Sequence, residues 1–185
     1  MVERCEWSGK KPIMIEYHDK EWGIPVHDDR KLFEMLILEG AQAGLTWLTI
    51  LKRRENYRKA FDNFIPHKVS KYDAKDISQL LTNAGIIRNK LKIKSTINNA
   101  KMFLETQKEF GSFDKYLWSF VDYKPIINNY KNLASIPPST TLSDKLSKDL
   151  KNRGFSFAGS TICYAFLQSV GVVNDHLTDC FTRKK

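Results

Sequence analysis

The stretch Leu81-Thr82-Asn83-Ala84-Gly85-Ile86-Ile87-Arg88-Asn89-Lys90 separates two segments in which apolar residues recur every three or four positions. The apolar residues are Ile77, Leu80 and Leu81 before the stretch, and Ile93, Ile97, Ala100 and Leu104 after it. Glycine permits a tight turn and the close approach of another part of the chain. We therefore expect two helices joined by a turn at Gly85, and this pair decides the class of fold.

The same turn has two interpretations. The backbone N–H groups at the beginning of the second helix point outward and attract an anion, and Lys90, Lys94 and Lys101 follow one stripe of that helix. A helix-hairpin-helix element uses such a turn to hold one DNA phosphate. The alternative is a plain corner between two helices, and a single glycine turn does not decide between them.

The rest of the chain also has helical periodicity. We expect one helix from Asp28-Asp29 to Glu39, a break bracketed by Gly40 and Gly44, and a second helix from Thr46 that ends at Phe64-Ile65-Pro66. A third helix is expected after a cap formed by Asp73 and Asp76, and another after Ser112. The last two are expected from a cap at Ser143 to Gly154 and from Ser160 to Val170, and residues 128–141 are expected to form a loop. No stretch alternates long enough to predict a strand. The sequence predicts an all-α fold with a single domain spanning 1–185, and a division into two helical lobes stays open.

Composition narrows the possible environments and partners. Of the 185 residues, 42% are apolar, which is enough for a core, but no run of 18 or more is apolar, so we expect no membrane span. The beginning of the chain lacks an apolar export signal, so the three cysteines are expected to be reduced thiols in a cytoplasmic protein. The net charge of +9 favours a polyanionic partner, although it could equally serve solubility alone.

Two cysteines and two histidines lie at the ends of the chain. Cys5 and His18 stand near the beginning, and His176 and Cys180 near the end. Two sulfurs and two imidazoles complete the tetrahedral set of a structural Zn²⁺ site, and one helical turn would bring the second pair together. The spacing is not that of a standard zinc finger, so a chance arrangement is the alternative.

One acid and four large rings are a second candidate site. Glu39 ends an apolar helix, where it is either an ordinary surface residue or a buried pocket acid, and burying a carboxylate without a partner is costly. The rings are those of Trp7, Tyr17, Trp22 and Trp47. They could hold a flat base between them or simply pack the core.

Several longer runs resemble one family. They are Tyr17-His18-Asp19-Lys20-Glu21-Trp22-Gly23, Leu38-Glu39-Gly40-Ala41-Gln42-Ala43-Gly44-Leu45-Thr46-Trp47, Ala84-Gly85-Ile86-Ile87-Arg88, Trp118-Ser119-Phe120-Val121, Lys151-Asn152-Arg153-Gly154-Phe155, Thr161-Ile162-Cys163-Tyr164 and Val173-Asn174-Asp175-His176. In this order they resemble the bacterial 3-methyladenine DNA glycosylase I (Tag) family over nearly the whole chain.

The resemblance implies a helix-hairpin-helix DNA glycosylase fold and a set of site residues. It implies a catalytic role for Glu39 in a base pocket with Tyr17, Trp47 and Trp7, and with Trp22 close by. It implies that DNA is contacted by a wedge at Gly44 and Leu45 and by a hairpin containing Gly85, Ile86, Arg88 and Lys90. It also implies that Cys5, His18, His176 and Cys180 hold a structural zinc ion.

The activity implied by the resemblance is hydrolysis of the N-glycosidic bond of 3-methyladenine in double-stranded alkylated DNA, by a monomer that flips the base and releases it. Many helix-hairpin-helix glycosylases carry a catalytic aspartate after the hairpin, whereas here no acid follows Gly85 before Glu105. The Tag family lacks this aspartate too, so the resemblance implies no conventional base to activate water. Two other classes stay open: a zinc hydrolase, which would need an open coordination position, and a non-catalytic, zinc-stabilised DNA-binding adaptor.

Overall fold

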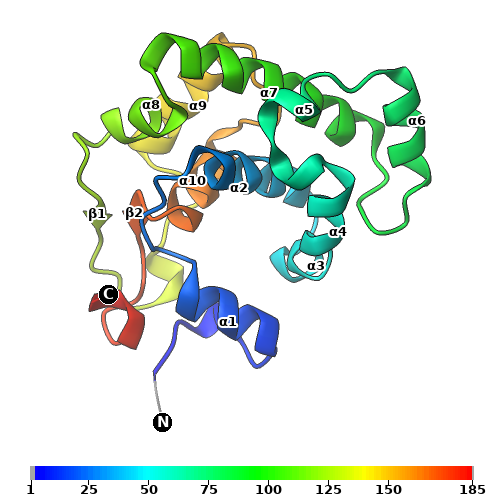
Figure 1. Ribbon diagram of the computed structural model, residues 1–185. Helices are drawn as coiled ribbons and strands as arrows, with labels where there is room; N and C mark the ends of the chain where they lie inside the picture. Colours follow the sequence, from blue (N-terminus) through cyan, green and yellow to red (C-terminus); the bar gives the residue numbers. More distant parts are fainter. Residues whose placement is uncertain (1–2, 185) are drawn as a thin grey trace.

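The computed structural model describes residues 3–184, and this part of the chain is mostly helical (Figure 1). The α-helices are α1 (Pro12–Lys20), α2 (Asp29–Gln42), α3 (Trp47–Leu51), α4 (Arg54–Ala60), α5 (Pro66–Val69), α6 (Ala74–Thr82), α7 (Lys90–Phe110), α8 (Phe113–Ser119), α9 (Thr141–Asn152) and α10 (Ser160–Ser169). Short 3₁₀ turns lie at Glu6–Ser8, Asp62–Phe64, Leu133–Ser135 and Phe181–Lys184. Among the helices of residues 3–184, none is long and apolar enough to cross a membrane.

Helix α2 lies at the centre of the core. The side chain of Asp28 caps it by accepting a hydrogen bond from the N–H of Lys31 at 2.8 Å, as predicted. Every residue from 32 to 41 is buried, because α2 contacts α3, α7, α8 and α10. The break predicted between Gly40 and Gly44 begins later than expected, because α2 continues to Gln42. A Cβ on Gly40 would lie 3.3 Å from the Cβ of Phe157, so this glycine permits close packing and does not end the helix.

The two helices around the Gly85 turn are α6 and α7, as predicted. Asp73 and Asp76 form the expected capping box at the beginning of α6. In the turn, the side chain of Asn83 accepts a hydrogen bond from the N–H of Gly85 at 2.8 Å. A Cβ on Gly85 would lie only 2.9 Å from the Cβ of Asn56, so the turn packs against α4 at a distance that only glycine allows.

Other boundaries differ from the predictions. The cap of α9 is Thr140, whose hydroxyl accepts from the N–H of Ser143, and Ser143 itself is the third helical residue. The helix expected from Thr46 divides into α3 and α4 near Arg53. Helix α1 was not predicted.

A pair of very short strands was also not predicted. β1 (Ile126–Ile127) and β2 (Val173–Asn174) pair in parallel. Two residues per strand are too few to give an alternating pattern. Their pairing brings the loop before α9 against the end of the chain.

The two ends of the described chain meet. The N–H of Phe181 donates to the carbonyl oxygen of Glu3 at 3.1 Å, and the N–H of Leu177 donates to Cys5 Sγ at 3.3 Å. In Figure 1 the blue α1 and the red C-terminal segment accordingly lie on the same side of the molecule.

Candidate functional site

A cavity of about 330 Å³ opens beside α2. It is lined by Trp7, Tyr17, Trp22, Glu39, Gln42, Trp47, Leu133, Ile136, Ala165 and Gln168. The four rings and the acid named from the sequence therefore all line the same cavity. Ring centroids are 4.9 Å apart for Trp7 and Trp22, and 5.2 Å apart for Tyr17 and Trp47. The remaining lining is mostly apolar, which suits a flat ligand.

Glu39 is the acid of this cavity, and it is only 5% exposed. Burial raises its pKa to about 8, although a hydrogen bond with Ser169 acts in the opposite direction. At neutral pH this pKa favours the protonated carboxyl group in the free protein. Burial, followed by the charge of Glu39, also raises the pKa of Tyr17. Both groups favour the uncharged state until a ligand brings a compensating charge.

The segment after α2 forms the rim of a second cavity of about 190 Å³. Gly44 has a φ of +74°, a conformation that side chains other than glycine's disfavour. Leu45 follows it and is 39% exposed. Glu39 lines both cavities, so the exposed leucine and the buried acid line the same second cavity.

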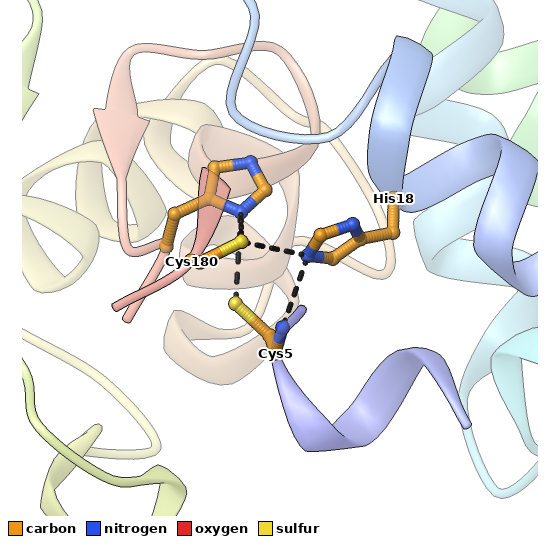
Figure 2. A group of neighbouring side chains, drawn as sticks. Cys5, His18 and Cys180 are labelled. Carbon is orange, nitrogen blue, oxygen red and sulfur yellow. Dashed lines mark hydrogen bonds between the residues drawn. The ribbon is translucent and has the colours of Figure 1, made fainter. Parts of the chain in front are cut away.

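The four predicted metal ligands meet at a buried point, and Figure 2 shows Cys5, His18 and Cys180 there. The ligand atoms of Cys5, His18, His176 and Cys180 all lie within 4.8 Å of one another. Cys180 Sγ is 3.4 Å from His18 Nε2 and 3.5 Å from His176 Nδ1. Cys5 Sγ is 3.6 Å from His176 Nδ1.

These distances suit a tetrahedral ion. Zinc bonds of about 2.3 Å to sulfur and about 2.05 Å to nitrogen give sulfur–nitrogen edges of about 3.6 Å. The residues present therefore fit the metal. The expectation that His176 and Cys180 share a helical turn was wrong, because this segment is a loop, yet their ligand atoms still come together.

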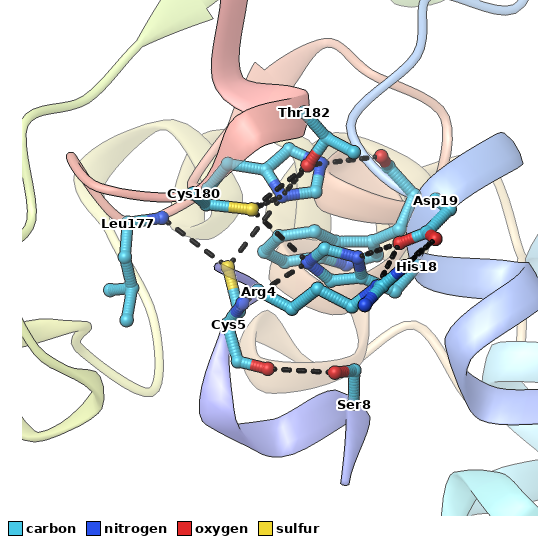
Figure 3. Close-up of polar contacts among 10 residues, drawn as sticks. Arg4, Cys5, Ser8, His18, Asp19, Leu177, Cys180 and Thr182 are labelled. Carbon is cyan, nitrogen blue, oxygen red and sulfur yellow. Dashed lines mark hydrogen bonds and ion pairs between the residues drawn. The ribbon is translucent and has the colours of Figure 1, made fainter. Parts of the chain in front are cut away.

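Outer contacts orient both imidazoles, and Figure 3 shows those of His18 with Asp19. His18 Nδ1 is 2.8 Å from Asp19 Oδ1, and Asp19 is in turn held by Arg4 at 2.8 Å. His176 Nε2 is 2.9 Å from the carbonyl oxygen of Trp22. Because a carbonyl oxygen only accepts, His176 donates from Nε2 and leaves Nδ1 free for a metal. Such partners fix the tautomer of metal-binding histidines.

Burial disfavours the charged forms of Cys5 and His176. It raises the pKa of Cys5 to about 12 and lowers the pKa of His176 to about 4. Thr182 Oγ1 lies 2.8 Å from His176 Nδ1 and 3.0 Å from Cys180 Sγ. Thr182 had no sequence signal, because a single threonine near a chain end is common.

The predicted DNA-contacting residues lie at the surface or in the turn. Arg88 and Lys90 are exposed, whereas Ile86 is buried at 3%. The N–H groups of Gly85 and Ile87 are already bonded to Asn83 and to the Tyr57 hydroxyl.

One lysine that the sequence analysis did not single out connects α7 to the end of α2, the helix that carries Glu39. Lys92 Nζ, in the first turn of α7, donates to the carbonyl oxygens of Ala41 at 2.8 Å and Ala43 at 2.6 Å. It therefore caps the end of α2 directly before Gly44. Its place in a run of lysines hid this contact.

A cavity walled by aromatic rings and one buried acid is suited to a planar ligand. A family model described as methyladenine glycosylase matches residues 7–183. The chain therefore belongs to the methyladenine glycosylase family.

Curated relatives and solved structures agree with this assignment. The chain is 51% identical over 180 residues to the DNA-3-methyladenine glycosylase of Haemophilus influenzae, covering 97% of each chain. It is 49% identical over 179 residues to DNA-3-methyladenine glycosylase 1 of Escherichia coli, covering 97% of this chain and 96% of that one. A crystal structure of a tyrosine-to-phenylalanine variant of 3-methyladenine DNA glycosylase I, in complex with 3-methyladenine, matches with a TM-score of 0.95 and 38% identity, covering 98% of both chains.

Proposed function

We propose that this protein is a base-excision repair enzyme that hydrolyses the N-glycosidic bond of 3-methyladenine in alkylated DNA, releasing the free base and leaving an abasic site. The observation that carries the proposal is Glu39, a carboxyl group 5% exposed in an aromatic cavity of about 330 Å³. Membership of the family and the activities named for its relatives support the same reaction.

The damaged base supplies much of the driving force. Methylation at N3 gives the adenine a positive charge, so the electron pair of the C1′–N9 bond leaves with the base, and the base departs neutral. Water then adds to C1′ and loses its proton to solvent. No acid lies between the Gly85 turn and Glu105, where a conventional base would be expected. The protein's main task is therefore to bind and orient the damaged base rather than to activate water.

Glu39 discriminates by charge and by hydrogen bonding. A cationic base beside it favours the ionised carboxylate, whereas ordinary adenine brings no charge to compensate for burial. An ionised carboxylate only accepts hydrogen bonds, and the adenine edge presents an amino donor. Guanine presents a carbonyl oxygen there and would leave the buried charge unpaired.

Tyr17, Trp47 and Trp7 hold the faces of the base, with Trp22 behind them. Attraction between a cation and an aromatic ring favours the methylated base over the neutral one. Three of these rings belong to or adjoin α1 and α3, while Glu39 belongs to α2. The pocket would then lie between two helical lobes of a single domain.

We propose that α6, the Gly85 turn and α7 form the helix-hairpin-helix element of a DNA glycosylase. Two N–H groups of the turn are bonded within the protein, so Arg88 and Lys90 are the better candidates for contacts to phosphate. Leu45 would enter the duplex from Gly44 and fill the space left by the flipped base, at a cost of a few kcal/mol for flipping. A double-stranded substrate and a monomeric enzyme complete the proposal.

The metal we propose is Zn²⁺, held by Cys5, His18, His176 and Cys180. When bound, it supplies four bonds that join the two ends of the chain. A closed Cys₂His₂ set leaves no coordination position for substrate, which argues for a structural role and against a zinc hydrolase. The donors lie outside the cavity that holds Glu39.

The test compares wild-type protein with Glu39→Gln on methylated duplex DNA, measuring 3-methyladenine release and DNA binding separately. We expect wild-type release and a loss of at least about 100-fold in the variant, since both charge selection and an acceptor disappear. Glu16→Gln, on the exposed side of α1, is the control. Binding without any release by the wild-type protein would instead identify a non-catalytic adaptor, which needs no buried acid.

A further inference from the structure

Gln168, in α10, lines the base cavity, and its side-chain amide is hydrogen-bonded to a residue outside that cavity. Its Nε2 donates to Asp175 Oδ2 at 2.7 Å. Its backbone carbonyl accepts from the N–H of Gly23 at 2.9 Å, which fixes the main chain at the same point. Both ends of this residue are therefore fixed before any ligand arrives.

Asp175 explains why the amide has one orientation. It is 0% exposed, and its Oδ1 accepts from Asn128 Nδ2 at 2.7 Å. The hydroxyl of Tyr164 donates to the same Oδ2 that Gln168 contacts. A buried carboxylate accepts only, so a reversed amide would set the Gln168 carbonyl oxygen against Oδ2 and cost a hydrogen bond to a charged group.

Gln168 lines the cavity, and its fixed amide leaves one atom without a partner in the described part of the chain. With Nε2 on Asp175, the carbonyl oxygen Oε1 lies on the other side of the amide group and has no hydrogen bond to any residue from 3 to 184. Glu39 faces the same cavity from α2, and α2 packs against α10. An adenine amino group carries two N–H donors, so two acceptors can each take one.

We propose that Gln168 is a specificity-determining residue whose Oε1 accepts an N–H of the flipped base, alongside Glu39. This rests on the proposed function and adds a second, uncharged acceptor to it. A base with a carbonyl oxygen at that edge meets repulsion from Oε1, and the amide cannot turn over to donate, because Asp175 holds it. Gln168 thereby rejects guanine-type bases without depending on charge.

The first test is Gln168→Met, which keeps the length and removes the acceptor. We expect free 3-methyladenine to bind about tenfold more weakly, as for one lost hydrogen bond of about 1.4 kcal/mol. We expect the ratio of 3-methyladenine to 3-methylguanine release from methylated DNA to fall by a similar factor. A purely structural role would lower the melting temperature and leave that ratio unchanged.

Gln107→Met is the matched control. Gln107 Nε2 also donates to a carboxylate, Asp29 Oδ2 at 2.5 Å, but the residue lies on α7 away from the base cavity. We expect this variant to keep the wild-type ratio even where its melting temperature falls. A ratio that falls equally in both variants overturns the proposal.

A second variant tests the orienting contact itself. In Asp175→Asn, one acceptor becomes a donor, so the Gln168 amide can turn over, and we expect the release ratio to fall while Oε1 is still present. Because Asp175 precedes His176, bound zinc is quantified in the same sample, and the ratio is compared only at full metal content. A wild-type ratio in both Gln168→Met and Asp175→Asn overturns the proposal.

A crystal of the wild-type protein soaked with 3-methyladenine needs no variant. A base nitrogen within about 3.2 Å of Oε1 supports the proposal, and a longer separation overturns it. If the wild-type protein releases 3-methyladenine and Gln168→Met keeps the wild-type selectivity, only the role of Gln168 is refuted. Wild-type protein that neither binds nor releases the base refutes the proposed function, and the role of Gln168 with it.

Discussion

His176 donates from Nε2 to the backbone carbonyl oxygen of Trp22 at 2.9 Å, and the two rings lie 4.7 Å apart between centroids. Trp22 in turn packs on Trp7 at 4.9 Å, and both tryptophans line the base cavity. The candidate metal centre therefore supports one wall of that cavity directly. Loss of metal should affect base binding as well as stability.

The carboxylate behind His18 gives the most selective test of the metal centre. Asp19→Asn should lower zinc affinity by about 10- to 100-fold, since outer partners of this kind orient the ligand and raise its basicity. Competition with a chelator measures the affinity. Asp114→Asn is the control, because Asp114 also contacts a histidine, His27 at 2.7 Å, but that histidine is 60% exposed.

The outcome for the pocket follows from the same variant. Partial loss of zinc from Asp19→Asn should be accompanied by weaker binding of 3-methyladenine, and added zinc should restore both. Zinc loss with unchanged base affinity and an unchanged melting temperature would contradict a supporting role for the metal.

Glu39 should make the protein less stable as the pH rises. Its pKa is about 8 when folded and 4.5 as the ordinary value, so between these limits the native state keeps a proton that the unfolded state loses. The free energy of unfolding should therefore fall by about 1.4 kcal/mol per pH unit in this window, relative to Glu39→Gln. Denaturant titrations of both proteins at pH 5.5 and 7.5 measure the difference.

Glu34 is the control for that measurement. It lies on the same helix and is 1% exposed, but it accepts from Arg58 at 2.7 Å. Glu34→Gln should destabilise the protein because it weakens a paired group. If Glu39→Gln likewise destabilised the protein at pH 7.5, the carboxyl group would have an unrecognised partner.

The rate of base release should have the opposite pH dependence. Below pH 8 the free Glu39 carboxyl is protonated and cannot act as a pure acceptor, so kcat/KM should rise with pH and be about tenfold below its plateau at pH 7. The pKa seen in kcat should be lower, because a bound cationic base favours the carboxylate. In Glu39→Gln, kcat/KM should not rise with pH in this range. A wild-type kcat/KM that is flat from pH 6 to 9 would refute the ionised role.

The sequence predicted the parts of the fold whose signals are local. Asp28, Asp73 and Ser112 cap the helices they were expected to cap, because a cap depends on neighbours three residues away. The end of α2 was expected too early, at Gly40. A glycine that permits close packing inside a helix cannot be distinguished by sequence from one that ends a helix, and here only the facing residue, Phe157, distinguishes them.

For the site, residue type was informative and position was not. The metal ligands were named because their chemistry is distinctive, yet the loop that carries His176 was expected to be helical. Gln168 and Lys92 were missed because their roles depend on Asp175 and Ala43, partners that only folding brings near. The raised pKa of Glu39 was equally hidden, because it depends on the degree of burial.

Leu45 should matter for duplex DNA and not for the pocket. Leu45→Ala removes most of a side chain that is 39% exposed at the rim, so release of 3-methyladenine from duplex DNA should fall about tenfold or more. Binding of the free base should stay unchanged. Ile127→Ala, on β1 and 54% exposed, is the matched control and should keep full activity. Equal losses in free-base binding and duplex activity would contradict a wedge role.

The Gly85 turn should tolerate a methyl group only if its neighbour yields. In Gly85→Ala the new Cβ would meet the Cβ of Asn56 at 2.9 Å, so we expect a loss of about 1–3 kcal/mol in stability and weaker binding to duplex DNA. Asn56→Gly removes the clashing atom, and the double variant should therefore recover part of both losses, which a double-mutant cycle measures. Asn83 Oδ1, 3.0 Å from the same Cβ, can move because it ends a side chain. If the two substitutions were additive in stability, the turn would not depend on the contact with α4, and its support by that helix would have to be abandoned.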